Sequence, residues 1–372
     1  MKFAPVCLFL TLATAAFAAP PSGVVTTIAG NPGIAGYWDG PATDAMFTHP
    51  TWLDVSIAPR SPTCDGKGNQ IFVVDRMNGL VRRIDETGFV TTVPAPLPAH
   101  LDFSGAFAGG VLVEQPGDGC GCGPYARGVF LSSTASGQVV LASPSGGLAA
   151  RDDWSTVMNG FVRPTGIARS KDTDEPFGST ILKRKVYVAD SGDHTIRRID
   201  WMLSFEACPQ GRNVSVLAGN PGHAGYADGT GSAALFDTPR GVATAPDGSI
   251  YVSDAGNQVI RKITPEGVVT TVAGTPGVAG SDDTHLNTPS GIDVNGKGEV
   301  FFVDTFNHAI RMIGTDGKLT TVAGQLGVSG FADGDAATAK FNAPVGLKVA
   351  PDGTIVIADT GNNVIRRLTL NR

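Results

Sequence analysis

The sequence predicts an all-β protein in which one four-stranded unit is repeated. The clearest copy runs from Gly241 to Gly274, GVATAPDGSIYVSDAGNQVIRKITPEGVVTTVAG, where four short apolar runs alternate with turn residues. Similar stretches follow at 291–324 and 346–370. A unit that cannot bury its own faces must stack on its neighbours, so this repetition decides the architecture.

Composition agrees with such a fold and argues against several functions. The chain has 372 residues, of which 42% are hydrophobic and 17% charged, as in folded proteins. It contains 49 glycines and 25 prolines without a collagen period, which suits many tight turns between short strands. A net charge of -6 and the absence of a Lys/Arg block argue against nucleic acid as a partner.

The second strand of each unit is apolar at nearly every position and ends in an aspartate, as expected when both of its faces are covered. The marker aspartates are Asp75, Asp190, Asp254, Asp304 and Asp359. The first interval is about twice the others and leaves room for a divergent unit, with Gly128–Ser133 as its second strand. Six units result.

The two ends of the chain complement each other. The stretch SGVVTTIAG at 22–30 matches GVVTTVAG at 267–274, which is a fourth strand, whereas the last repeat ends without one. Pairing of 24–30 with the C-terminal repeat would close a ring and remove its free sheet edges. We therefore predict a six-bladed β-propeller with four-stranded blades, formed as a single domain by residues 19–372.

Residues 1–18 read as a signal peptide. Lys2 provides the basic start, an apolar run extends from Val6 to Phe17, and A-F-A precedes a predicted cleavage after Ala18. No other stretch approaches the ~18 to 20 apolar residues of a membrane helix, so no transmembrane anchor is expected. We expect a secreted, extracellular monomer.

The motif V-A-x-x-P-D-G followed by I-Y-V-x-D-x-x-N-x-x-I-R-x-I resembles the NHL repeat, and it covers essentially all of 19–372. The resemblance implies that the loops joining strands four to one and two to three share one face, here called the upper face, and that the other loops share the lower face. The family includes receptor and adhesion modules, interaction platforms and a few enzymes, so the motif indicates a fold more than a function.

The most regular polar residues are interpreted as structural. Each marker aspartate is followed three residues later by an Asx residue, namely Asn78, Asp193, Asn257, Asn307 and Asn362. Such pairs are typical of tight turns, although a ring of carboxylates holding a cation is the alternative. The recurring arginines, Arg82, Arg197, Arg261, Arg311 and Arg366, are expected to be surface or inter-blade partners of these acids.

Residues that break the repeat are the candidates for ligand binding, because the fold does not demand them. Trp52 stands where other units have a glycine, at the start of an innermost strand. The full candidate set on the upper face is His49, Trp52, Arg163, His194, Arg240 and His308. Ordinary solvated loop residues around a filled channel are the alternative interpretation.

Catalysis has weaker support in the sequence. In the amidating lyase that shares this fold, zinc-binding histidines come from around the channel, and two of them directly follow the proline that opens an innermost strand. Here those positions hold Thr51, Thr165, Arg240, Ser290 and Val345. His49, His194 and His308 could instead converge on a metal, but no G-x-S-x-G motif is present. We expect no catalytic residue and no cofactor, with calcium or zinc as the alternative.

Four cysteines remain after removal of the signal, an even number for an oxidising compartment: Cys64, Cys120, Cys122 and Cys208. The repeat places all four on the lower face of three consecutive blades. We predict that one member of the Cys120/Cys122 pair bonds Cys64 and the other bonds Cys208, since neighbouring cysteines rarely bond each other. Asn213, with Val214 and Ser215, forms one glycosylation sequon.

The function expected from the sequence is recognition of an extracellular protein, peptide or glycan by the upper loop face. Loops on a rigid scaffold are where such discrimination usually lies. The alternative is a metal-assisted lyase or hydrolase with its site over the central channel.

Overall fold

The computed structural model describes residues 22–56, 70–93, 108–114, 128–142, 156–171, 181–204 and 212–371. The predicted signal peptide and the four cysteines of the predicted disulfides lie outside these ranges.

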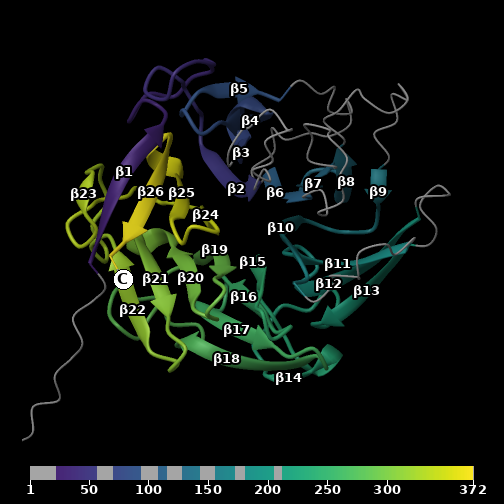
Figure 1. The fold of residues 1–372 in the computed structure, drawn as a ribbon. Coiled ribbons are helices and arrows are strands. Elements are labelled where there is room, and N and C mark those ends of the chain that lie inside the picture. The colour runs from purple at the N-terminus through teal and green to yellow at the C-terminus, as the bar shows by residue number, and fades with distance from the viewer. Residues whose placement is uncertain are drawn as a thin grey trace, which may run out of the picture.

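The strands form six antiparallel sheets arranged around a centre (Figure 1). Two sheets come first in the chain: β2 (Pro50–Ser56), β3 (Gln70–Asp75), β4 (Leu80–Ile84) and β5 (Val90–Thr92), then β6 (Ala108–Glu114), β7 (Gly128–Ser133), β8 (Gln138–Ala142) and β9 (Thr156–Met158). The third has β10 (Pro164–Arg169), β11 (Ile181–Asp190), β12 (Thr195–Ser204) and β13 (Arg212–Ala218).

The later sheets follow the same order. One consists of β14 (Gly229–Thr230), β15 (Pro239–Thr244), β16 (Ile250–Asp254), β17 (Val259–Ile263) and β18 (Val268–Gly274), and the next of β19 (Pro289–Val294), β20 (Val300–Asp304), β21 (Ala309–Ile313) and β22 (Leu319–Ala323). The closing sheet has β23 (Gly334–Asp335), β24 (Gly346–Val349), β25 (Ile355–Asp359), β26 (Val364–Leu370) and β1 (Gly23–Ala29). The sequence did not predict β14 and β23, which add a fifth strand to two sheets.

This arrangement confirms an all-β fold of the β-propeller type. Helix is limited among the described residues to four single turns: Arg76–Asn78, Gly231–Ala233, Thr305–Asn307 and Thr360–Asn362. In sheet β6–β9, Val139 and Met158 are buried together with Val186, Val188 and Ile199 of the next sheet.

The ends of the chain meet as expected. Strand β1 pairs antiparallel with β26, from Gly23 opposite Leu370 to Ala29 opposite Ile365. Since β26 also pairs with β25, the first and last strands belong to one sheet. The two termini therefore close the ring together.

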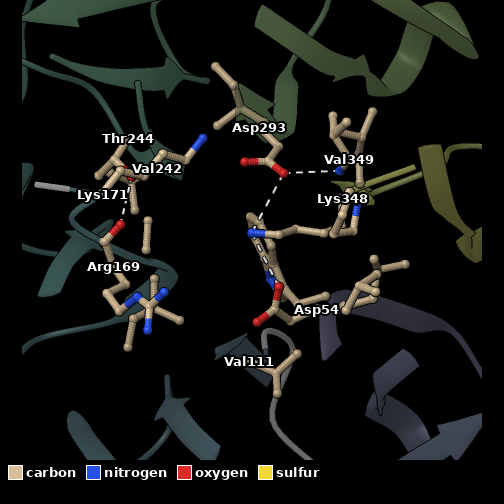
Figure 2. A pocket seen from close by; sticks show the side chains of 17 residues that line it. Asp54, Val111, Arg169, Lys171, Val242, Thr244, Asp293, Lys348 and Val349 are labelled. Atoms are coloured by element: carbon tan, nitrogen blue, oxygen red, sulfur yellow. Dashed lines mark hydrogen bonds and ion pairs between the residues drawn. The ribbon is translucent and has the colours of Figure 1, made fainter. Parts of the chain in front are cut away.

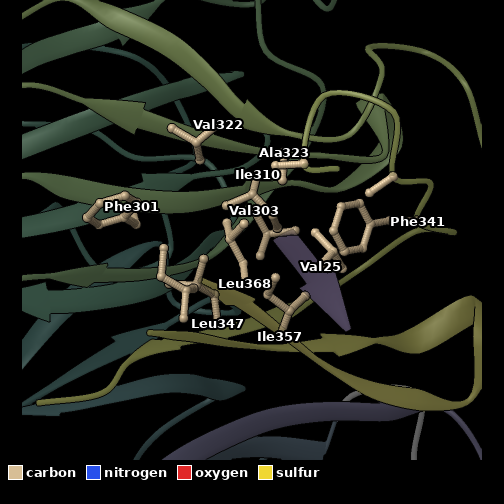
Figure 3. Close-up of a cluster of buried hydrophobic side chains, with 13 residues drawn as sticks. Val25, Phe301, Val303, Ile310, Val322, Ala323, Phe341, Leu347, Ile357 and Leu368 are labelled. Atoms are coloured by element: carbon tan, nitrogen blue, oxygen red, sulfur yellow. The ribbon is translucent and has the colours of Figure 1, made fainter. Parts of the chain in front are cut away.

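Apolar side chains from neighbouring sheets fill the space between them. In one cluster, Val25 of β1 lies with Leu368 and Ile357 of the closing sheet and with Phe301 and Val303 of β20, all nearly inaccessible to solvent (Figure 3). Burial of such side chains contributes roughly 1.5–3 kcal/mol each. Strand two is buried along its whole length in β20 and β25, as the continuous apolar pattern predicts.

All five recurring arginines pair with the marker aspartates, as expected, but all except Arg197 are fully buried, so the expectation of surface groups was wrong for four of them. Four of them have fully buried side chains and bond the marker aspartate through Nη1: the distances are 2.9 Å in Arg82–Asp75, 2.9 Å in Arg261–Asp254, 3.3 Å in Arg311–Asp304 and 2.8 Å in Arg366–Asp359. Each of these buried guanidinium groups is thus paired with a buried carboxylate, which offsets part of the cost of burying its charge.

The Asx residues complete these clusters, as the structural interpretation predicts. Asn78 donates from Nδ2 to Asp75, and Asn307 and Asn362 donate likewise to Asp304 and Asp359, each at 2.8 Å. The marker carboxylates are therefore engaged in holding their own turns.

Candidate functional site

A cavity of about 180 Å3 lies in the central channel. It is lined by residues from all six innermost strands, β2, β6, β10, β15, β19 and β24. The space greatly exceeds the roughly 10–15 Å3 that one water molecule needs, so it can hold a small molecule. It lies toward the C-terminal ends of the innermost strands, and of the predicted upper-face set only Trp52 lines it.

Three charged side chains from three different strands meet in this cavity (Figure 2). Lys348 Nζ of β24 lies 3.2 Å from Asp54 Oδ1 of β2 and 3.6 Å from Asp293 Oδ2 of β19. Burial opposes the charge on Lys348, but Asp293 and Asp54 outweigh it and raise the lysine's pKa above its ordinary value. Lys348 is therefore a permanent cation between two carboxylates.

A second lysine reaches the cavity from the end of β10. Lys171 Nζ donates to the carbonyl oxygen of Val294 at 2.7 Å. Burial lowers the pKa of Lys171, and the charge of Lys348 adds to this effect while Asp293 opposes it. The cavity thus offers ammonium donors and carboxylate acceptors within one small volume.

These charged residues were not among the predicted site residues, although the sequence contains a signal for them. Asp54, Asp293 and Lys348 occupy equivalent positions of their innermost strands, where two other units carry Ala168 and Ala243. Charged residues at an inward position of an otherwise apolar strand need partners. A comparison of the repeats at this one position would have identified them.

Trp52 is the one predicted ligand residue that lines the cavity. Its neighbours explain why the other units carry glycine: a Cβ at Gly346 would meet the Thr51 carbonyl oxygen at 1.9 Å, and one at Gly241 would meet the Ser290 oxygen at 2.2 Å. Adjacent innermost strands approach too closely there for a side chain. Trp52 therefore occupies a position at which the close approach of neighbouring strands requires glycine in the other blades.

The other predicted residues lie outside the cavity lining. His49 and Arg163 are exposed, and Arg240 is partly buried. Burial lowers the pKa of Arg240, and the positive charge of nearby Arg76 lowers it further. Arg76 lies in the single helical turn after β3 and Arg240 lies on β15, so the ring brings two cations close together.

His194 and His308 connect neighbouring blades. Each adopts a left-handed backbone conformation, and its Nδ1 accepts the backbone N–H of a residue just before the next innermost strand: Thr238 N to His194 at 3.1 Å, and Ala343 N to His308 at 2.9 Å. Gln258 and Asn363 accept the equivalent N–H groups of Thr288 and His49. These four contacts are here called the inter-blade latches.

The His308 latch should make stability depend on pH. Burial lowers the pKa of His308 below its ordinary value, so the unfolded chain binds the proton more readily. Stability is then present above the unfolded pKa of about 6.5 and is lost as the pH falls through the lower folded value. We expect His308→Asn, which copies the Asn363 latch, to reduce this acid loss with little change at pH 8. Thermal melts of both proteins from pH 5 to 8 measure this loss of stability. An equal loss at low pH in both proteins would contradict the prediction.

Metal binding finds no geometric support in the described ranges. His49, His194 and His308 do not come together there, and no group of three His, Cys, Asp or Glu side chains in those ranges could hold a metal ion. Asn213 of the sequon is exposed on β13. No helix in the described segments is long and apolar enough to cross a membrane.

Fold and site together define a β-propeller with a charged cavity in its channel. No protein-family model matches the chain. Over 356 residues it is 29% identical to Protein SUPPRESSOR OF QUENCHING 1, chloroplastic, of Arabidopsis thaliana. That match covers 92% of the chain but 27% of the plant protein, so the chain spans about a quarter of that relative's length.

Solved structures show the same fold at low sequence identity. An auxiliary nutrient binding protein of Bacteroides thetaiotaomicron is 17% identical with a TM-score of 0.64, over 94% of this chain and 77% of the other. A putative phosphatase of the same species is 13% identical with a TM-score of 0.67, over 94% of this chain and 79% of the other. At these identities the similarity concerns the fold alone.

Proposed function

We propose that this protein is a binding module whose channel cavity holds a small polar ligand, of the size of an amino acid or a monosaccharide. The observation that carries the proposal is the meeting of Asp54, Asp293 and Lys348 in one cavity. Carboxylates and ammonium groups at fixed positions can orient a ligand that has both donors and acceptors. The small volume favours such a ligand over a peptide.

The wider architecture of the proposal follows from the sequence. We infer six blades of NHL type in one domain, 19–372, with sheet β6–β9 as the divergent second blade, since β6 contacts both β2 and β10. Export through a signal peptide cleaved after Ala18 and a disulfide framework on the lower face belong to the same proposal. The nutrient-binding description of one structural neighbour suits a small-ligand role outside the cytoplasm.

Recognition of a protein, peptide or glycan by the upper face is a second candidate. His49 and Arg163 are exposed there, and Arg76 and Arg240 place two cations near each other. The third candidate, a metal-assisted lyase or hydrolase, predicts stoichiometric zinc or calcium in the purified protein and its loss in His194→Ala. Metal analysis separates that candidate from both binding roles.

The small-ligand proposal is testable by fluorescence, because Trp52 lines the cavity. We expect one or more of the twenty amino acids or common monosaccharides to change the tryptophan emission saturably. Lys348→Met should weaken that binding at least tenfold, since the ligand loses its cationic partner. Asp293→Asn, which keeps the side-chain volume, provides a second test if the lysine variant is unstable.

Two controls accompany the titration. Trp52→Phe should remove the fluorescence change, and Asp352→Asn, which neutralises an exposed turn residue, should leave the affinity unchanged. A ligand that binds equally well to Lys348→Met and Asp293→Asn would place the site elsewhere. If none of the amino acids and none of the monosaccharides binds, the proposed ligand class is refuted.

A further inference from the structure

In three sheets, an arginine and a threonine near the outer edge bind one aspartate carboxylate, an arrangement here called the carboxylate cradle. In sheet β2–β5, Arg82 donates to Asp39 Oδ1 from Nε at 3.1 Å and from Nη2 at 2.6 Å. Thr92, which lies opposite Arg82 on β5, donates to the same carboxylate from its N–H at 2.9 Å and its hydroxyl at 3.1 Å. The cradle is therefore a guanidinium edge plus one threonine.

The other two cradles bind an aspartate with the same pair of residue types, although Arg261 uses Nη2 alone and its Nε has no hydrogen-bond partner among the described residues. Asp333 receives Arg366 Nε at 2.9 Å and both donors of Thr27 at 3.0 and 3.2 Å. Asp228 receives Arg261 Nη2 at 2.7 Å and both donors of Thr271 at 3.2 Å. All three carboxylates come from the long connection before an innermost strand.

In sheet β19–β22, no carboxylate of the described residues bonds the equivalent outer donors, although Arg311 Nη1 bonds the marker Asp304. Arg311 and Thr321 stand opposite each other on β21 and β22, in the register of Arg261 and Thr271. Within the described part of the chain, Arg311 Nε, Arg311 Nη2 and Thr321 Oγ1 are buried and have no hydrogen-bond partner. Buried unsatisfied donors are costly and call for a ligand group.

The chain's own acid does not reach this cradle for a local reason. Asp283 aligns with Asp228, but the glycine that follows each cradle aspartate is replaced by Thr284. Those glycines, Gly40, Gly229 and Gly334, have φ of 149°, 155° and 117°, a region that threonine rarely adopts. Asp282 meanwhile forms a separate turn, in which it accepts the N–H groups of Thr284 and His285 at 2.8 Å.

We propose that Arg311 and Thr321 form a binding site for the carboxylate of a ligand, in the place that an aspartate takes in the three sister cradles. Asp283 and Asp282 lie close enough to favour the charge on Arg311 but bond neither its Nε nor its Nη2, so the ligand carboxylate competes with them for the guanidinium. The backbone around Asp282 covers the guanidinium, since its carbonyl oxygen accepts Arg311 Nη1 at 3.2 Å. The ligand group therefore reaches the donors only if the segment 282–284 shifts.

Acetate is the test probe, with chloride at equal ionic strength as the reference. We expect acetate to raise the melting temperature of the intact protein saturably, because it binds the folded state alone. Thr321→Val should raise the half-saturating acetate concentration at least threefold. Thr92→Val is the matched control: it alters a cradle already filled by Asp39 and should leave the acetate response unchanged.

Two further variants decide between a ligand and the chain's own acid. Thr284→Gly restores the glycine that follows the aspartate in the other three cradles. Asp283 should then bind Arg311 and Thr321 and abolish the acetate response. Asp283→Asn should keep that response, with little loss of stability. The proposal is overturned if acetate acts no differently from chloride, if Thr321→Val responds like the parent protein, or if Asp283→Asn destabilises as much as Asp39→Asn.

Discussion

Removal of β1, Gly23–Ala29, is expected to abolish cooperative folding of the whole ring. The strand supplies the outer partner of β26 and contributes to two cores at once, because Val25 and Ala29 belong to different clusters on either side of the closing sheet. Without it, β26 presents an unpaired edge and both adjoining cores lose their cover. Thermal unfolding followed by circular dichroism should show a broad, non-cooperative loss of signal.

Point variants of the same strand provide a graded version of this test. Val25 is fully buried and Val24 is 41% exposed. We expect Val25→Ala to cost about 2 kcal/mol or more, as large-to-small changes in a core do, and Val24→Ala to stay within about 0.5 kcal/mol. A truncated chain that keeps the melting transition of the full protein would refute closure by β1.

Arg366→Met is expected to be the most destabilising single substitution, by about 3–5 kcal/mol, because it leaves a buried charge unpaired. The guanidinium bonds Asp359 at 2.8 Å and Asp333 at 2.5 Å and also donates to two carbonyl oxygens, Ala332 O and Lys340 O. It lies between the rings of Phe331 and Phe341, 4.7 and 5.1 Å from their centroids. Methionine can replace the packing but none of these bonds. Chemical denaturation measures the loss.

Arg367 provides the control, since it is the next residue on β26 and is exposed. Arg367→Met should change the free energy of unfolding by less than about 0.5 kcal/mol. The double variant Asp359→Asn/Arg366→Met should recover part of the loss. Equal effects of the Arg366 and Arg367 substitutions would show that the buried cluster contributes nothing to stability.

The Arg366→Met deficit should also depend on pH. Burial raises the pKa of Asp359 to about 6, and hydrogen bonds from Asn342 and Asn362 together with Arg366 oppose that rise. Without Arg366 this pKa rises further. An acid whose pKa is higher in the folded than in the unfolded state makes the protein less stable as the pH rises from the unfolded to the folded pKa. The deficit is therefore expected to be larger at pH 8 than at pH 5, and the same denaturation series reads it out.

The fold was predictable because its signals are local and repeated. Apolar runs that end in aspartate, turns of the type Pro-Asp-Gly and the matching ends of the chain together specify stacked antiparallel sheets and their closure. The structural role of the Asx residues was equally predictable, since Asn307 and Asn362 need only their own turns. The predicted cysteine pairing lies outside the described ranges and stays a prediction.

The candidate site was less predictable, because its residues interact only through the ring. His194 and His308 break the repeat in the sequence, yet they perform the same latch as Gln258 and Asn363. Breaking the repeat in the sequence therefore did not distinguish these histidines from the other latch residues. The position of Trp52 was recognised, but its cavity and charged neighbours were not.

The sequence by itself determined the repeating unit, the all-β class and the strand that closes the ring, because these depend on patterns within about fifty residues and on one match between the ends. Tertiary structure alone decided which charges meet. Asp54, Asp293 and Lys348 are far apart in the chain and become neighbours when three innermost strands converge on the channel. Likewise, the unsatisfied donors of Arg311 and Thr321 emerge only by superposing one blade on its sisters, since burial and hydrogen bonding are properties of the packed molecule.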